Sequence, residues 1–111
     1  MRKIIGRFYF KLTTNGNLLG EYSNSASRGF PVGTESAMRE STGTGYLGIY
    51  RTSWNETDSA SQVLVRITFK RGTNNLIYTV LWEENGSIIF WGEGMMCDNI
   101  LIGDYRNFAN I

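Results

Sequence analysis

Three carboxylates occupy positions from which an acid or a base could act on a substrate. Glu21, Glu93 and Asp104 each lie in a short glycine-containing run flanked by apolar residues. If two of them faced one cavity, burial and mutual repulsion would raise the pKa of one, and general acid–base catalysis would become possible. A carboxylate beside an inward-facing tyrosine on a strand more often faces solvent, so we assign no catalytic residue.

Other reactive groups are scarce. The chain has no histidine, and so lacks the commonest metal ligand and the usual general base near neutral pH. The single cysteine, Cys97, excludes an internal disulfide and a metal site built from several cysteines. We expect Cys97 to be a small buried apolar residue, with a reactive thiol or an intermolecular disulfide as the alternative. We therefore expect neither a metal nor a cofactor.

A glycine pattern at residues 43–48, Gly-Thr-Gly-Tyr-Leu-Gly, matches the spacing of a dinucleotide-binding loop. Such a loop follows a strand and opens a helix. Here a polar segment precedes the pattern, and the β-like residues 49–51 follow it. The pattern therefore predicts a glycine-rich entry into a bent strand.

Composition narrows the class of protein further. The 111 residues suit a single domain, residues 1–111, with one core. The 11 Lys and Arg and 10 Asp and Glu leave a net charge of +1, which argues against nucleic acid as a partner. No run is long and apolar enough to span a membrane. The basic start is followed by only two apolar residues, which is too short for a signal peptide, so the cytoplasm is favoured unless a leader was removed.

Turn signals separate segments with the length and composition of strands. Asn15-Gly16 and Asn85-Gly86 predict two-residue hairpins, because a type I′ turn needs positive φ at both central residues. Residues 62–70 alternate most cleanly, with Val63, Val65, Ile67 and Phe69 expected to face inward. The Ser-, Gly- and Thr-rich residues 25–44 predict a long loop, with one helical turn at 37–40. We expect strands at residues 5–13, 17–24, 45–54, 62–70, 76–84, 87–96 and 100–107.

A repeated phrase predicts how these strands are arranged. Residues 18–22, 46–50 and 101–105 all read apolar-apolar-Gly-x-Tyr, and residues 90–94 are a degenerate copy. A glycine inside a strand marks a bend, a bulge or a close approach of backbone, and an aromatic ring on the same face can cover it. Repetition of this device predicts an all-β protein, a small antiparallel up-and-down barrel of about seven to eight strands.

These phrases and the start of the chain resemble the calycins, the group of lipocalins, fatty-acid-binding proteins and avidins. Gly6-Arg7-Phe8 resembles their first-strand Gly-x-Trp, with Phe in place of Trp. The resemblance implies ligand contacts at Tyr22 and Asn24, which match an avidin-like Tyr-x-Ser, and at Trp91. It also argues against biotin, because Phe10 and Tyr105 stand where an avidin has its ligand-binding Asn and Asp.

The aromatic residues predict a pocket at one end of the barrel, partly covered by residues 25–44. Small-molecule sites combine aromatic walls with a few polar groups, and small barrels can hold one ligand. We therefore predict a protein that binds a small apolar ligand. An interaction or inhibitor module with a filled barrel, and a barrel isomerase or cyclase, are the alternatives, and the presence and lining of a cavity distinguish them. The expected ligand-binding residues are Tyr22, Asn24, Tyr50, Trp82, Trp91 and Tyr105.

Two expected strands lack a polar face. Residues 76–82 and 88–91 carry apolar or aromatic side chains on both sides. A strand of this kind has the core on one side and a further partner on the other. The sequence therefore predicts a homo-oligomer.

Overall fold

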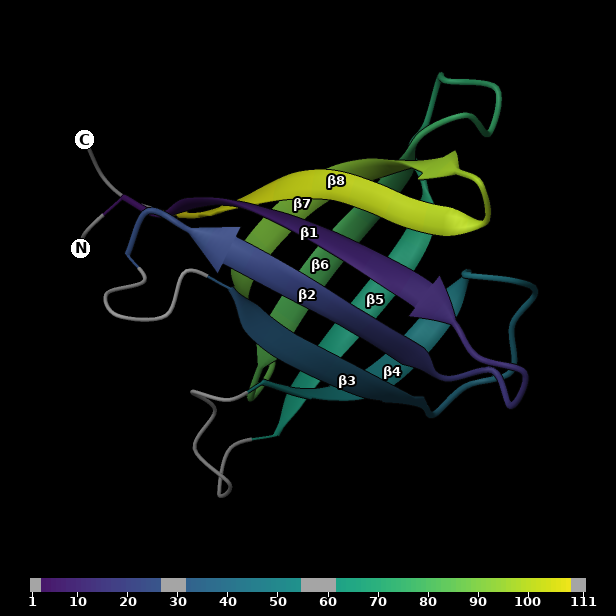
Figure 1. The fold of residues 1–111 in the computed structure, drawn as a ribbon, viewed down its shortest axis with the longest axis horizontal. Coiled ribbons are helices and arrows are strands. Elements are labelled where there is room, and N and C mark those ends of the chain that lie inside the picture. The colour runs from purple at the N-terminus through teal and green to yellow at the C-terminus, as the bar shows by residue number, and fades with distance from the viewer. Residues whose placement is uncertain (1–2, 27–31, 55–61, 109–111) are drawn as a thin grey trace.

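The computed structural model describes residues 3–26, 32–54 and 62–108. These residues form an all-β closed barrel in which every strand pairs antiparallel with the next one along the chain, and the last pairs with the first (Figure 1). The described part contains no helix, and therefore none that could span a membrane. The predicted up-and-down barrel is confirmed. Its strands are β1 (Ile5–Leu12), β2 (Leu18–Asn24), β3 (Gly33–Arg39), β4 (Gly48–Trp54), β5 (Val63–Phe69), β6 (Tyr78–Glu84), β7 (Ser87–Cys97) and β8 (Ile100–Asn107).

Strand β3 corrects the predicted loop at residues 25–44, of which residues 27–31 lie outside the described part. The helical turn predicted at residues 37–40 is wrong, because Ala37 pairs with Leu18 of β2 and Thr52 of β4. Inward and outward positions alternate regularly along β3. Its inward residues are Gly33, Glu35 and Ala37, so the strand has a buried face but none of the large apolar residues that reveal one in a sequence.

Large apolar side chains fill the middle of the barrel. Val63, Val65 and Ile67 of β5 are fully buried, as their alternation predicts. Phe69 is 37% exposed, because it lies at the end of β5, where its ring packs beside Tyr78 rather than into the core. The largest fully buried side chains are Tyr50, Phe10, Leu18, Ile67 and Leu101.

Arg39 closes one end of the barrel. Its guanidinium lies 4.8 Å from the centre of the Tyr50 ring. Its Nε donates to the Gly16 carbonyl and its Nη1 to the Leu47 carbonyl, both at 2.9 Å, and its Nη2 donates to the Tyr50 hydroxyl at 2.8 Å. These bonds tie the β1–β2 turn to the β3–β4 connection. The other end of the barrel, where β1 begins and β2 ends, is therefore the one that can open to a ligand.

Tyrosine rings at this other end lie against bare backbone. Tyr105 faces Gly6 across the β1–β8 pair, and Tyr22 faces Gly33 across the β2–β3 pair. A Cβ on Gly6 would lie 2.5 Å from Tyr105 Cε1, and one on Gly33 would lie 2.6 Å from Tyr22 Cε1. Each ring therefore covers a glycine on the neighbouring strand, not the glycine of its own phrase. This arrangement lays the two rings along the wall and leaves space at the centre.

Candidate functional site

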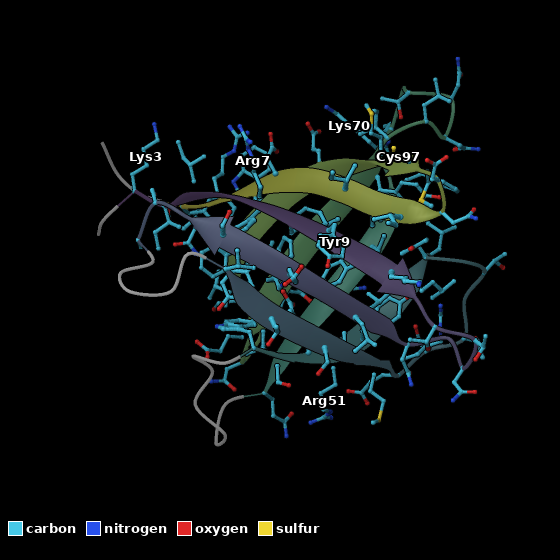
Figure 2. All side chains as sticks on the ribbon, in the orientation of Figure 1. Lys3, Arg7, Tyr9, Arg51, Lys70 and Cys97 are labelled. Atoms are coloured by element: carbon cyan, nitrogen blue, oxygen red, sulfur yellow. The ribbon has the colours of Figure 1, made fainter. Side chains whose placement is uncertain are left out.

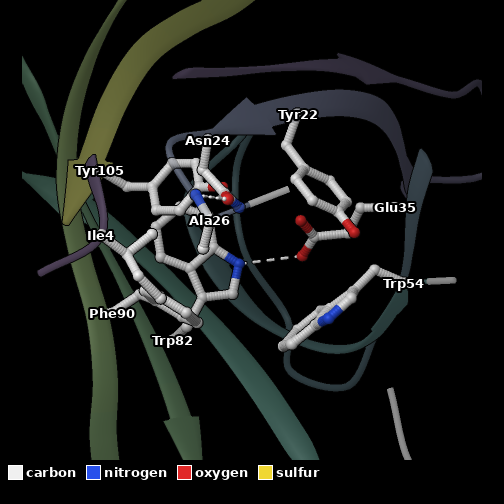
Figure 3. A pocket seen from close by; sticks show the side chains of 9 residues that line it. All are labelled: Ile4, Tyr22, Asn24, Ala26, Glu35, Trp54, Trp82, Phe90 and Tyr105. Atoms are coloured by element: carbon white, nitrogen blue, oxygen red, sulfur yellow. Dashed lines mark hydrogen bonds between the residues drawn. The ribbon is translucent and has the colours of Figure 1, made fainter. Parts of the chain in front are cut away.

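A cavity of about 120 Å³ lies at the end of the barrel opposite Arg39. It lies where β2 and β4 end and where β3 begins. Figure 3 shows that its walls are mainly aromatic rings, with one carboxyl and one carboxamide among them. The lining residues are Ile4, Tyr22, Asn24, Ala26, Glu35, Trp54, Trp82, Phe90 and Tyr105.

Aromatic packing holds part of the cavity wall in place. The Tyr105 ring lies 5.5 Å from the ring of Phe90 and 5.5 Å from that of Trp82. Trp82 in turn packs edge-on against Phe8, 5.4 Å away in the core. Such edge-to-face and tilted contacts are favourable arrangements for aromatic pairs. These contacts therefore fix the positions of Phe90, Trp82 and Tyr105 in the cavity wall.

Glu35 supplies the carboxyl group of the cavity. Its side chain comes from an inward position of β3, and the residue is only 6% exposed. Thr52 Oγ1 donates a hydrogen bond to Glu35 Oε2 at 2.5 Å, and Trp82 Nε1 donates to the same oxygen at 2.9 Å (Figure 3). The other oxygen, Oε1, accepts no hydrogen bond from a described residue. Two donors therefore fix the carboxyl while one of its oxygens stays available.

Burial raises the pKa of Glu35 from its usual 4.5 to about 7. Desolvation disfavours the ionised form, and this effect outweighs the hydrogen bonds from Thr52 and Trp82, which favour it. Near neutral pH the group is therefore divided between a carboxylate, which only accepts hydrogen bonds, and an acid, which can donate one.

The carboxamide of Asn24 is the second polar group at the cavity wall. Its Nδ2 donates to the Tyr105 hydroxyl at 2.8 Å, and its Oδ1 accepts from the backbone N–H of Ala26 at 2.9 Å. The second bond is a turn closed by an Asn side chain at the end of a strand. The backbone N–H of Ala26 therefore orients the Asn24 carboxamide.

Four of the six residues predicted from sequence to bind ligand line this cavity, namely Tyr22, Asn24, Trp82 and Tyr105. Tyr50 does not. It is fully buried beneath Arg39, at the opposite end of the barrel, and its hydroxyl donates to the Tyr46 carbonyl at 2.9 Å. Its placement in a shared pocket is corrected, because the phrase that ends in Tyr50 lies where β4 begins, at the closed end of the barrel.

Trp91 also lies away from the cavity, because β7 contains one extra residue. Glu83 faces Ile88 and Trp82 faces Phe90, so Ile89 is left without a partner on β6. Such a bulge reverses the alternation of every residue that follows it. Phe90 consequently faces the cavity, and Trp91 lies outside, with the guanidinium of Arg106 4.6 Å from its ring centre.

The three carboxylates singled out in the sequence do not share a cavity. Glu21 accepts a hydrogen bond from the Tyr9 hydroxyl at 2.5 Å on the outer surface, and Glu93 pairs with Lys70. The Asp104 side chain is 58% exposed. Glu35 is not among the residues predicted from sequence, because it lies in the segment expected to be a loop. Its inward neighbours on β3 are Gly33 and Ala37, so no large apolar residue marks this buried face in the sequence.

The thiol of Cys97 is exposed near the end of β7, so the expectation that it is buried is wrong (Figure 2). It follows the exposed Met96 at the rim of the barrel, beyond the last position that faces the core. In the described ranges, no three residues among Cys, Asp and Glu come together in a way that could hold a metal ion.

The chain was compared with protein-family models, curated proteins and solved structures. No protein-family model, no curated protein and no solved structure matches the chain. The cavity and the residues that line it are therefore the basis for assigning a function.

Proposed function

We propose that this protein binds a small, mostly apolar ligand in the aromatic cavity at one end of its barrel. The observation that carries this proposal is the cavity itself, about 120 Å³ in volume and walled by Tyr22, Trp54, Trp82, Phe90 and Tyr105. An apolar cavity of roughly 150 Å³ accepts benzene, so this one suits a ligand of about one ring. Ligand sites elsewhere likewise combine apolar walls with a few polar groups.

We further propose that the barrel is of the calycin type, close in design to lipocalins and avidins. Its closed, eight-stranded, up-and-down order supports this assignment. Gly6 supports it as well, since it lies on β1 directly opposite Tyr105 of β8, where the barrel closes.

The alternatives predict different cavities and different chemistry. A filled barrel that acts only through its outer surface has no need of a lined cavity, so the cavity favours a ligand binder. A barrel isomerase or cyclase is favoured by Glu35, because a carboxyl group with a pKa of about 7 can give or take a proton at neutral pH. Stoichiometric binding of a ligand that is recovered unchanged would support a binder, and turnover would support an enzyme.

Binding can be tested with toluene and benzyl alcohol, followed by tryptophan fluorescence and calorimetry. We expect both to bind, because Trp82 and Trp54 line the cavity. The Trp54→Ala variant removes one wall and is expected to weaken binding by about tenfold. Trp91→Ala is the matched control, since Trp91 lies on the outer surface, and it should leave the affinity unchanged. Equal losses in the two variants, or no binding of either compound, would contradict the proposed site.

We also propose that the chain associates with a second copy of itself through an exposed surface of β7 and β8. Met95 and Ile102 face each other across the β7–β8 pair and are 53% and 48% exposed. Together with Ile77 they line a shallow hollow on the outer surface. Charged residues of both signs also line the hollow, and exposed apolar side chains often mark protein–protein contacts.

Light scattering tests this surface directly. We expect the wild-type protein to be larger than a monomer, and Ile77→Glu or Ile102→Glu to shift it toward the monomer without unfolding it. Leu19→Glu is a matched control, because Leu19 is 55% exposed on β2, outside the hollow. A monomeric wild type at all concentrations would show that this hollow has no partner subunit.

A further inference from the structure

We propose that the ligand of this cavity carries a protonated amine, and that Glu35 Oε1 is the atom that anchors it. This inference rests on the proposed function and specifies its ligand as a small aromatic or short aliphatic amine. It follows from the position of the carboxyl, from the charge around it and from the aromatic character of the walls.

The two oxygens of Glu35 are used unequally. Oε2 accepts both hydrogen bonds, from Thr52 Oγ1 and from Trp82 Nε1. Oε1 accepts none from the described residues, although Glu35 is 94% buried and lines the cavity. Thr52 and Trp82 therefore hold the carboxyl in one orientation, and its remaining oxygen is an acceptor that a ligand can reach.

The described residues around Glu35 supply no positive charge. No lysine or arginine is among the described residues that line the cavity. Glu35 forms no ion pair with any described lysine or arginine elsewhere. An ionised carboxylate that is buried without a counter-charge is unfavourable. A ligand ammonium group would provide that charge and up to three hydrogen-bond donors. A carboxylate ligand, by contrast, would be repelled.

The cavity walls favour the same ligand. Tyr22, Trp54, Trp82, Phe90 and Tyr105 present five aromatic rings around the space that Glu35 faces (Figure 3). The faces of aromatic rings attract cations, Trp most strongly. The rings also supply the apolar surface that the body of the ligand needs. The carboxylate and the rings therefore select for a compact apolar group that carries one basic nitrogen.

Amine binding should depend on pH in a direction that identifies Glu35. An alkylamine stays protonated through neutral pH, as the lysine side chain does. Its partner must be the ionised form of Glu35, so its affinity should rise about tenfold per pH unit up to about pH 7 and then level off. A ligand that instead accepted a hydrogen bond from the protonated acid would bind more weakly as the pH rises.

The experiment compares three compounds of one shape, benzylamine, benzyl alcohol and benzoate, by calorimetry between about pH 5.5 and 8.5. At about pH 8 we expect benzylamine to bind at least tenfold more tightly than benzyl alcohol, with benzoate the weakest. Glu35→Gln should remove both the amine preference and the pH dependence, so that benzylamine binds no more tightly than benzyl alcohol. Thr52→Val keeps the carboxyl but removes a hydrogen bond that favours its ionised form, so the midpoint of the benzylamine profile should move to higher pH.

Each outcome separates the two proposals. If benzyl alcohol binds and benzylamine binds no better, the amine anchor is wrong and the ligand site stands. The anchor is also wrong if the amine preference survives in Glu35→Gln, or if the Thr52→Val profile does not move. If none of the three compounds binds, both proposals are overturned.

Discussion

The free energy of unfolding is expected to fall by about 3 kcal/mol as the pH rises from about 4.5 to 7, because of Glu35 alone. Burial raises its pKa from 4.5 to about 7 in the folded chain. Below the lower value the carboxyl is protonated in both the folded and the unfolded states, and the stability is at its full value. Between the two values only the unfolded chain ionises, which favours unfolding by about 1.4 kcal/mol per pH unit. Above the folded pKa the loss is complete.

Urea titrations at a series of pH values, on the wild-type protein and on Glu35→Gln, measure this effect. The difference in unfolding free energy between the two proteins isolates Glu35, because every other titrating group is common to both. Gln can still accept hydrogen bonds from Thr52 and Trp82 but cannot ionise. We expect this difference to change by about 3 kcal/mol across the pH range, in favour of the variant at the alkaline end. A constant difference would show that Glu35 ionises as readily in the folded chain as in water.

Replacing Gly103 by Ala is expected to destabilise the barrel by about 3 kcal/mol. A Cβ at this position would overlap the carbonyl oxygen of Glu93 on the neighbouring strand, and would lie 2.7 Å from the Gly94 Cα. Both obstacles are backbone, so no side-chain rotation relieves them. Strands β7 and β8 would have to separate, which lengthens their hydrogen bonds where they pack most closely.

Gly94→Ala is the matched control for this substitution. Gly94 faces Gly103 directly, also in the barrel interior, but the nearest atom to a Cβ there would be the Ile102 carbonyl oxygen at 3.0 Å. We expect a loss of about 1 kcal/mol or less, because a shift of a few tenths of an ångström relieves the contact. Thermal unfolding followed by circular dichroism measures both variants. Equal losses would mean that the strands accommodate a methyl group at either position, and that Gly103 is not required for the close approach.

The turns illustrate how far local sequence predicts this fold. Asn85 and Gly86 both have positive φ, as the predicted two-residue hairpin requires. Asn15-Gly16 instead belongs to a longer turn, in which the Thr13 N–H donates to the Asn17 carbonyl and only Gly16 has positive φ. The same residue pair thus forms two different turns. The dipeptide signals a reversal of the chain, and the neighbouring strands decide its form.

The candidate site was predictable only in part, for physical reasons. Tyr22, Trp82 and Tyr105 stand at regular alternating positions, so simple periodicity places them on the inside. The same periodicity places Trp91 on the wrong side of the wall, because the extra residue Ile89 reverses the alternation. No residue type nearby indicates a bulge. Glu35 could not be predicted although it lies at a regular inward position of its strand. Charged residues are almost never buried without a partner, so a sequence gives little ground for placing one inside a barrel.

The pairing of β1 with β8 affects how this chain can be made. It joins segments about a hundred residues apart, with the Ile4 N–H donating to Asn107 Oδ1 at 2.8 Å, and the start of β1 lies beside the end of β8 (Figure 1). A ribosome releases the N-terminal strands first. During synthesis, β1 and the newest strand are therefore two unpaired edges, which favour aggregation. Because Tyr105 belongs to β8, neither the barrel nor its cavity can be complete until the last strand has left the ribosome.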